Sequence, residues 1–222
     1  MIEVTHIDHM GSDLSVVNAA RVSFGKKREA LGTVTNGDKT SIVLHDTDRK
    51  LIKYLAKHRH MSPFGHAFAS FHIKAPVFVA RQLVKHKFLR WNEISRRYVD
   101  EEPEFYVPDV WRGRSADKKQ GSEGEVKIPY LVPHEFNKSA LYEYETLLEA
   151  GVAPEQARMV LPQSTMTEWY WSGSLDAFAD MCNLRCKSDT QYETRIVAQQ
   201  ISEIMEGLFP VSWPALTKPW RH

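Results

Sequence analysis

The chain has 222 residues, of which 42% are hydrophobic and 26% are charged, and its formal net charge at pH 7 is +1. That length allows one large domain or two small ones with a hydrophobic core, and the composition is ordinary for a soluble globular protein. A net charge near zero argues against a general nucleic-acid coat protein, and no apolar stretch approaches the roughly 20 residues of a membrane helix.

The two cysteines, Cys182 and Cys186, are separated by about one helical turn. That spacing favours reduced thiols over a disulfide framework. The first residues also lack the apolar centre of a signal peptide. We therefore expect a cytoplasmic protein without a membrane segment.

The N-terminal quarter of the sequence predicts two helices. Residues 1–12 are typical of a short strand and turn, and a helix is expected over residues 13–22. Residues 25–40 are polar and contain glycines, so we expect a mobile loop there. A second helix is predicted to begin at Asp46 or Thr47. Its inner face would carry Leu51, Ile52 and Leu55.

The next segment predicts a turn, a strand and a third helix. Residues 58–66 are turn-like and contain three histidines, and residues 67–74 alternate as in a strand. Pro76 suits the first turn of the helix that follows. The apolar stripe of this helix would consist of Val77, Val79, Ala80, Leu83 and Val84.

The C-terminal half begins with an irregular segment, residues 99–133. Its polar run, residues 114–125, is predicted to be an exposed insertion. The elements expected after it are a helix over 134–150, a short helix after Pro154 that carries Arg158, a strand over 164–171, a helix from Ser174 and a helix over 189–209.

The first of these helices is expected to turn Phe136, Ala140, Tyr144 and Leu147 inward. The sequence contains no repeat and no clear interdomain linker. We therefore expect a single α+β domain over residues 1–222, with a mixed, mostly antiparallel sheet flanked by helices.

Positive charge is concentrated in the basic stretch from Arg81 to Tyr98, which reads RQLVKHKFLRWNEISRRY. It contains six lysines or arginines against one acid, so it carries about +5. On a weakly acidic background, charge concentrated in this way indicates an anionic partner. Gln82, Asn92 and Ser95 lie among the cations and suit a small planar ligand.

A nucleotide would explain this combination, because its phosphate needs cations and hydroxyl donors and its base needs amide or carboxylate partners. Neither G-x-x-x-x-G-K-[ST] nor G-x-G-x-x-G occurs, so side chains would hold the phosphate. Two alternatives stay open: a solvated cationic surface, and a single-stranded nucleic-acid-binding module that stacks bases on Trp91 and Tyr98. Mild repulsion of a polyanion by the rest of the chain disfavours the second.

A metal site is not expected. The spacing of His58, His60, His66 and His72 matches no zinc motif, and neither cysteine is close to them in sequence. The two cysteines fit the core of a helix better than they fit a nucleophile's site.

Several blocks of the sequence together resemble one family. Lys85-His86-Lys87, followed after seven residues by Ser95, resembles the R-H-R-x7-S motif of the flavin-dependent thymidylate synthases. Other blocks resemble the same family in the same order: AARVSF (19–24), HMSPFGH (60–66), KAPVFVARQ (74–82), ARMVLP (157–162) and NLR (183–185). Ordered blocks spread over about residues 13–200 are far more specific than one short motif.

The resemblance implies an activity. The chain would convert dUMP to dTMP, with methylenetetrahydrofolate as the one-carbon donor and with a hydride from FAD that NADPH has reduced. The resemblance also implies a homotetramer whose FAD and dUMP sites lie between subunits. It implies neither a nucleic-acid partner nor a membrane partner.

Matching positions then imply the site residues. Arg185 would be catalytic, because a permanent cation there would favour ionisation of the uracil ring. The dUMP contacts would be Gln82, Lys85, Glu93, Ser95, Arg97, Arg158 and Arg185. The FAD contacts would be His60, Ser62, Lys85, His86, Lys87, Glu93, Ser174 and Asp180, and His60 would also lie near the folate.

The sequence departs from the family pattern at six positions, one of which is Ser174 in place of the asparagine of the flavin-binding N-x-R. Lys85 and Lys87 replace two arginines and keep the charge without the bidentate fork. Gly65 stands where many members have an acid, and Asp176 and Asp180 stand where the flavin-binding pattern has arginine and asparagine. A flavin- or nucleotide-binding paralogue without catalysis therefore stays open as an alternative.

Overall fold

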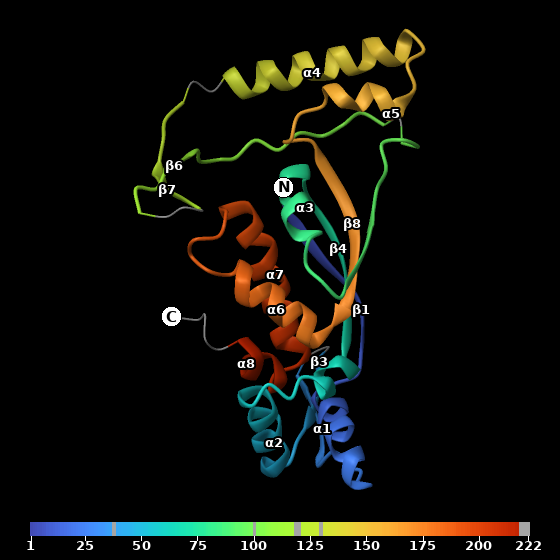
Figure 1. Cartoon of the computed structure of the whole chain (residues 1–222), viewed down its shortest axis with the longest axis vertical. Helices are drawn as coiled ribbons and strands as arrows, with labels where there is room; N and C mark the ends of the chain where they lie inside the picture. The colour runs from blue at the N-terminus through green and yellow to red at the C-terminus, as the bar shows by residue number, and fades with distance from the viewer. Residues whose placement is uncertain (37–38, 100, 118–120, 129–130, 218–222) are drawn as a thin grey trace.

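A computed structural model describes residues 1–36, 39–99, 101–117, 121–128 and 131–217 of the chain. The molecule is elongated. A sheet runs along its long axis, helices pack beside the sheet, and smaller elements lie at both ends (Figure 1).

The central sheet has four strands in the order β1-β4-β8-β5. They are β1 (Glu3–Met10), β4 (Phe68–Pro76), β8 (Met166–Ser174) and β5 (Leu89–Glu93). Every neighbouring pair is antiparallel. The predicted α+β class with an antiparallel sheet is confirmed, but the sheet is not mixed, because no strand in the described residues runs parallel to its neighbour.

One face of the sheet is buried, because successive side chains of a strand point to opposite faces. Phe71 of β4 and Trp169 and Trp171 of β8 are almost completely buried on this face. Phe178 packs edge-on against Phe71 and Trp171, with ring centroids 5.1 and 5.5 Å apart. These aromatic contacts fix the helix that carries Phe178 against the sheet.

The helices on this face are α6 (Leu175–Arg185) and α7 (Tyr192–Leu208), both to one side of β8 in Figure 1. The apolar side chains of α6 are buried almost all round, including Leu175, Phe178 and Met181. Cys182 and Cys186 are both buried and are not joined in a disulfide, in line with the predicted core thiols.

The opposite face of the sheet carries polar groups. Lys74 forms a salt bridge with Glu104 at 2.7 Å, and His72 Nε2 lies 3.0 Å from Glu168 Oε2. Tyr170 is half exposed on this face. An antiparallel sheet with one packed and one polar face is a common arrangement.

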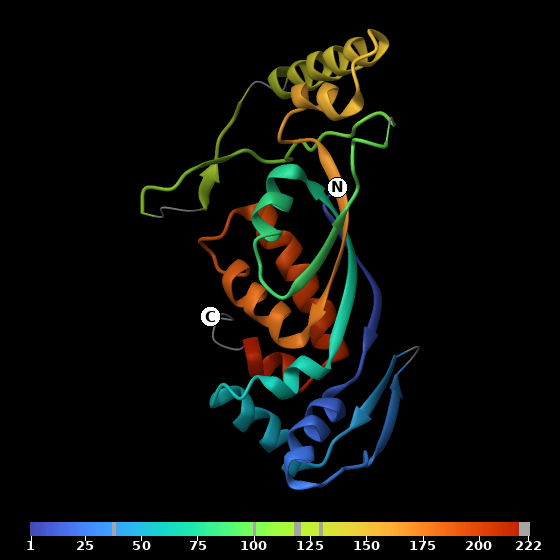
Figure 2. The ribbon, with the colours of Figure 1, turned by 45° about the vertical axis from the view of Figure 1, so that its right-hand side comes forward.

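At the lower end of the molecule, helices from the first quarter of the chain lie next to the last described helix (Figure 2). Asp13 is buried at the start of α1, and its two carboxylate oxygens accept the backbone N–H groups of Val211 and Ser212 at 2.9 and 2.8 Å. The elements here are α1 (Asp13–Arg21), η1 (Val22–Phe24), the hairpin β2 (Gly32–Asn36) and β3 (Lys39–Val43), α2 (Asp46–Lys57), η2 (Ser62–His66) and α8 (Ser212–Thr217).

The upper end contains α4 (Leu131–Glu149), α5 (Pro154–Ala157) and η3 (Arg158–Val160), and α3 (Val77–Leu83) follows β4. A small hairpin of β6 (Arg112–Arg114) and β7 (Ser122–Glu125) lies beside α7 (Figure 1). The described helices include none that is both long and apolar enough to cross a membrane.

Several local predictions were wrong. Within the expected loop over residues 25–40, residues 32–36 and 39–40 belong to the β2–β3 hairpin, because its threonines and valine favour extended backbone. β5 was not predicted, since it gains its hydrogen bonds only from β8. Phe136 is 60% exposed and Val84 is 47% exposed, because α4 packs mainly on α5 and η3, and α3 ends at Leu83.

The described part of the polar run 114–125 is mostly exposed, as expected. Its ends are nevertheless ordered as β6 and β7, and Ser115 is buried and donates a hydrogen bond to Glu123 at 2.6 Å.

Asp13→Ala should lower the free energy of unfolding by about 2 to 4 kcal/mol, because two buried N–H groups lose their only described side-chain acceptor. Asp13→Asn should cost less, since its carbonyl oxygen can still accept one of them. Urea unfolding measures both. The control is Asp46→Ala, an exposed acid in the first turn of α2, which should cost less than about 1 kcal/mol. Equal losses in the Asp13 and Asp46 variants would contradict this role.

Candidate active site

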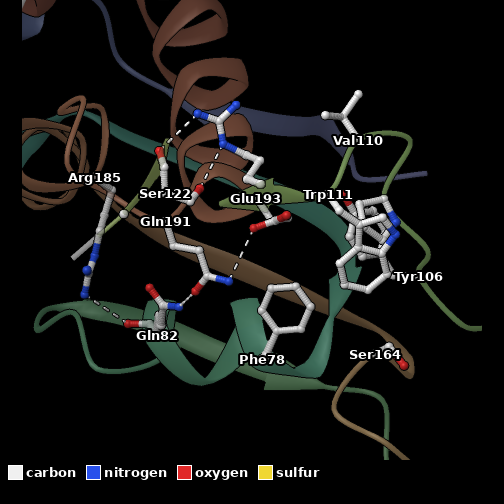
Figure 3. Close-up of a pocket in the computed structure, with 13 residues that line it drawn as sticks. Phe78, Gln82, Tyr106, Val110, Trp111, Ser122, Ser164, Arg185, Gln191 and Glu193 are labelled. Atoms are coloured by element: carbon white, nitrogen blue, oxygen red, sulfur yellow. Dashed lines mark hydrogen bonds between the residues drawn. The ribbon is translucent and has the colours of Figure 1, made fainter. Parts of the chain in front are cut away.

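The candidate active site is a cavity of about 710 Å³ between the helical layer and the β6–β7 hairpin. Figure 3 shows side chains from distant parts of the sequence lining it. Two of them, Gln82 and Arg185, were predicted as site residues. The others are Phe78, Tyr106, Pro108, Val110, Trp111, Arg112, Gly121, Ser122, Ser164, Gln191 and Glu193.

Arg185 is held at this cavity by two neutral partners. Its Nε donates to Nε2 of His86 at 3.0 Å, and its Nη2 donates to the carbonyl oxygen of Gln82 at 3.4 Å. It forms no salt bridge with any acid in the described part of the chain. Its positive charge is therefore not neutralised by the protein's own side chains.

His86 is uncharged in this arrangement. Its Nε2 accepts a hydrogen bond, so a neutral ring carries its proton on Nδ1. Burial, together with the nearby Arg185 cation, lowers the pKa of His86 to about 4. The histidine therefore supports Arg185 without adding a second positive charge.

A chain of amide groups crosses the cavity floor. The side-chain amide of Gln82 donates to Gln191, and Gln191 donates to Glu193 at 3.3 Å (Figure 3). Gln82 comes from α3, whereas Gln191 and Glu193 lie at the start of α7. The link fixes the orientation of Gln82, which faces the cavity.

The β6–β7 hairpin forms the roof of the cavity. Arg112 donates to Ser122 Oγ at 2.8 Å and to its carbonyl oxygen at 3.0 Å, and its guanidinium lies 5.0 Å from the ring centroid of Tyr192. Gly121 approaches the loop before α7 so closely that a Cβ there would lie 2.7 Å from the Asp189 carbonyl oxygen. These contacts dock the hairpin on α7.

A second group of predicted residues lies around α5. Arg97 Nε lies 3.6 Å from Glu155 Oε2, and Arg158 Nε donates to the Glu155 carbonyl oxygen at 3.2 Å. Ser95 Oγ accepts the N–H of Arg97 at 3.3 Å. The structure therefore brings Ser95, Arg97 and Arg158 together, although Arg158 is 61 positions after Arg97.

Glu93 lies at the end of β5 and is held by both oxygens. Its Oε1 accepts the Thr167 hydroxyl at 2.7 Å, and its Oε2 accepts the indole N–H of Trp91 at 3.1 Å. Lys85 and Lys87 are exposed in the turn between α3 and β5, where Phe88 has a positive φ of 65°. That turn reverses the basic stretch onto the sheet edge.

The third group lies at the other end of α6. Ser174 donates to Asp176 at 2.5 Å, while Ser62 and His60 lie in or next to η2 and His60 is exposed. Burial raises the pKa of Asp180, Asp176 adds to that rise, and Arg59 opposes it. None of these residues lines the cavity that holds Arg185.

Most of the predicted site residues thus fall into three groups on one chain, and Lys85, Lys87 and Glu93 lie outside these groups. Sequence reasoning missed several residues that line the cavity, chiefly Tyr106, Trp111, Arg112, Gln191 and Glu193. The aromatic and cationic content of residues 105–112 was the available signal. Among the described residues, no group of three or more potential metal ligands occurs.

Comparison with known proteins gives the following matches. The family model described as thymidylate synthase complementing protein matches residues 5–211. A flavin-dependent thymidylate synthase of Thermus thermophilus is 40% identical over 211 residues, which cover 94% of this chain and 73% of that protein. The protein of the same name from Thermosipho africanus is 38% identical over 217 residues, 96% of this chain and 89% of its own.

Among solved structures, the UMP/dUMP methylase PolB from Streptomyces cacaoi, bound with 5-Br dUMP, has a similar fold. Its TM-score is 0.82 and its identity 32%, with 100% of this chain and 97% of that chain covered. The structure of PolB bound with 5-Br UMP gives a TM-score of 0.79 and 31% identity.

His86→Gln should make the stability of the protein less sensitive to acid between about pH 6.5 and pH 4. The folded pKa of about 4 lies below the ordinary value of 6.5, so the unfolded chain binds the proton first as the pH falls. The stability that depends on a neutral His86 is therefore present above pH 6.5 and is lost as the pH falls through 4. Denaturant unfolding at a series of pH values measures it. Parallel profiles for the two proteins would contradict a neutral, buried His86.

Gly121→Ala should detach the hairpin from α7, because the new Cβ meets the Asp189 backbone and the glycine has a φ of 88°. Amide exchange of residues 121–125 should become faster. Gly124→Ala is the matched control: its φ of 64° is also positive, but nothing lies within 4 Å of the added Cβ. Equal exchange rates in the two variants would show that the hairpin does not depend on this contact.

Proposed function

This chain belongs to the flavin-dependent thymidylate synthase family, and from that premise we propose that it methylates C5 of dUMP to give dTMP. The one-carbon donor is methylenetetrahydrofolate. FAD, reduced by NADPH, is the cofactor that supplies the hydride when it is bound. The observation that carries this proposal for the site is the unneutralised Arg185 cation at a nucleotide-sized cavity.

Arg185 acts on the uracil ring. Carbon C5 becomes nucleophilic as negative charge develops on the ring, and a fixed cation in a partly desolvated cavity stabilises that charge. Arg185 can do so because both its partners are neutral, whereas a carboxylate partner would already have cancelled its field. Burial lowers the pKa of Arg185, but the guanidinium stays charged at neutral pH.

Gln82 positions the ring beside Arg185. Its side chain offers an amide to the base edge, and its link to Gln191 restricts rotation of that amide. Glu93 is similarly fixed by Thr167 and Trp91. Lys85 lies in the same basic stretch and contributes charge at its exposed turn.

The phosphate of dUMP binds at Ser95, Arg97 and Arg158. In the structure Glu155 contacts both arginines. The Arg97–Glu155 salt bridge is half exposed, with 3.6 Å between Nε and Oε2, so it contributes little to stability. A phosphate dianion competes well with it, because arginines bind phosphate through charge-assisted hydrogen bonds.

The residues proposed for FAD fit an anionic, hydrogen-bonding cofactor in part. His86 is a neutral ring at the edge of the cavity, Lys85 and Lys87 are exposed cations, and Ser62 and Ser174 present hydroxyl groups. The acids Asp176 and Asp180 are near each other on α6, and burial raises the pKa of Asp180. His60 and Glu93 are the remaining contacts.

We further propose a homotetramer in the cytoplasm. Support for the assembly comes from the distribution of the proposed FAD and dUMP residues over three groups, which neighbouring subunits would combine around one flavin. Exposed apolar side chains such as Val22, Phe24 and Phe88 are available for subunit contacts. The reduced thiols agree with a cytoplasmic location.

Arg185→Ala should lower kcat for dTMP formation by a factor on the order of 10² to 10³, because it removes a preorganised charge from the reacting ring. Arg185→Lys should retain more turnover. The assay contains dUMP, methylenetetrahydrofolate, FAD and NADPH, and measures dTMP. It also separates the enzyme from a non-catalytic paralogue and from a nucleic-acid-binding module, since neither would form dTMP.

The matched control is Arg195→Ala. Arg195 donates to the Ser188 carbonyl oxygen and stacks on Tyr192, but it does not line the cavity. The kcat of this variant should stay within about a factor of three of that of the unmodified protein, which corresponds to a change in activation free energy of less than about 1 kcal/mol. Near-normal kcat in Arg185→Ala would remove Arg185 from the mechanism.

A further inference from the structure

A second cavity of about 710 Å³ lies at the lower end of the molecule, between α2 and the segment 210–216. No residue proposed for dUMP or FAD lines it. Its lining has two parts: a row of cations on and after α2, and an apolar floor. The full lining is Arg49, Lys53, Ala56, Lys57, Arg59, Asn183, Pro210, Val211, Pro214, Ala215 and Leu216.

The cations form a row because of helical spacing. Arg49, Lys53 and Lys57 are each four residues apart on α2, so they lie on one face with a rise of about 6 Å between neighbours. The row is about 12 Å long before Arg59 extends it. Lys50, on the next face of the same helix, lines a different hollow.

The cations of this row have no acidic partner at salt-bridge distance in the described part of the chain. Arg49 lowers the pKa of Asp13, and Arg59 lowers the pKa of Asp180, by electrostatic interaction without a salt bridge. Asp13 is already occupied by two backbone N–H groups. Like charges on one helix face repel one another, so this arrangement is destabilising without an anion.

The floor of the cavity is suited to an elongated ligand. Prolines and aliphatic side chains make it apolar, and Asn183 adds one polar group. The amide of Asn183 donates to the Leu216 carbonyl oxygen at 3.0 Å, while its own oxygen is buried and has no hydrogen-bond partner. A buried acceptor left unpaired is destabilising, and a ligand N–H would satisfy it.

Arg59 occupies a backbone position that normally favours glycine. The N–H of Arg59 bonds to Ala56 at 3.2 Å and that of His60 to Leu55 at 2.9 Å, which is the Schellman pattern at a helix C-terminus. Arg59 is the left-handed residue of this motif, with a φ of 58°. The left-handed backbone conformation is strained for an arginine, so we expect the Arg59 side chain to have a role that glycine could not fill.

We propose that this cavity binds the γ-glutamyl tail of the folate substrate, with the cations pairing with successive carboxylates of a polyglutamate. This inference rests on the proposed function, because the folate is its one-carbon donor. A γ-glutamyl chain combines regularly spaced carboxylates, apolar methylene groups and amide N–H groups. The carboxylates match the row of cations, the methylene groups match the apolar floor, and the amide N–H groups match the unpaired Asn183 oxygen. Arg59 directly precedes His60, which the family resemblance places near the folate, so the cavity adjoins this element of the proposed site.

The test compares methylenetetrahydrofolate carrying one glutamate with the same compound carrying five. The unmodified protein should bind the pentaglutamate about five- to tenfold more tightly, as a few partly exposed ion pairs provide. The ratio of the dissociation constant for the monoglutamate to that for the pentaglutamate should fall to near one in the double variant Lys53→Gln/Lys57→Gln. Calorimetry gives the dissociation constants, and raising the salt concentration should also shrink the ratio.

Two further variants make the result specific. Lys50→Gln removes a cation from the same helix but not from this face, so the ratio should be unchanged. Arg59→Gly removes the charge and relieves the backbone, so the ratio should fall while the melting temperature stays equal or rises. A lower ratio from mere unfolding would instead lower the melting temperature.

A ratio near one in the unmodified protein, or an equal ratio in all variants, would overturn the proposal. It would also be overturned if dTTP bound here, with affinity lost in the double variant, while the glutamate ratio was one; the cavity would then be a nucleotide site. Formation of dTMP with the monoglutamate is measured in parallel. Its absence would refute the proposed function, whereas the binding ratio tests the tail site independently.

Discussion

The structure depends on the pairing of β8 with its two neighbours. β8 pairs with β4 over nine residues, from Phe68↔Ser174 to Pro76↔Met166, and its other edge pairs with β5. Gly173 leaves space for Leu89 in the second pairing, because a Cβ there would lie 2.4 Å from Leu89 Cδ2 and the leucine side chain would have to shift. The pairing of β5 with β8 brings Glu93, at the end of β5, within hydrogen-bond distance of Thr167.

The same strand also places Arg185. β8 leads directly into α6, and the aromatic contacts of Phe178 with Phe71 and Trp171 fix that helix on the sheet. Arg185 is the last residue of α6, so its position follows from the register of the sheet. Gln82 reaches it from the end of α3, and His86 reaches it from the turn that follows. A central ladder of backbone hydrogen bonds therefore determines the geometry of a charged site.

Charge in this molecule is arranged in two ways. Arg185 is held by neutral groups, because burial and the Arg185 charge disfavour a second ring proton on His86, and Gln82 offers only a carbonyl oxygen. The arginines near α5 instead share Glu155, and the cations of α2 that line the second cavity have no acid at salt-bridge distance in the described chain. Both kinds of site keep positive charge available for an anion, and both lower the stability of the unliganded protein.

The sequence by itself determined the elements whose side chains repeat regularly and the residues that belong to ordered motifs. The helix over residues 13–22 and the strand that became β4 have clear periods, and the basic stretch identified Gln82, His86 and Arg97 through its motif. Only the tertiary structure decided that Gln82, His86 and Arg185 form one group, Arg97 and Arg158 another, and His60 and Asp180 a third. It also decided that Trp111 and Arg112 roof the cavity and that β5 is a strand. The physical reason is that β5 and the β6–β7 hairpin are held by partners distant in sequence, and local spacing carries no information about such partners.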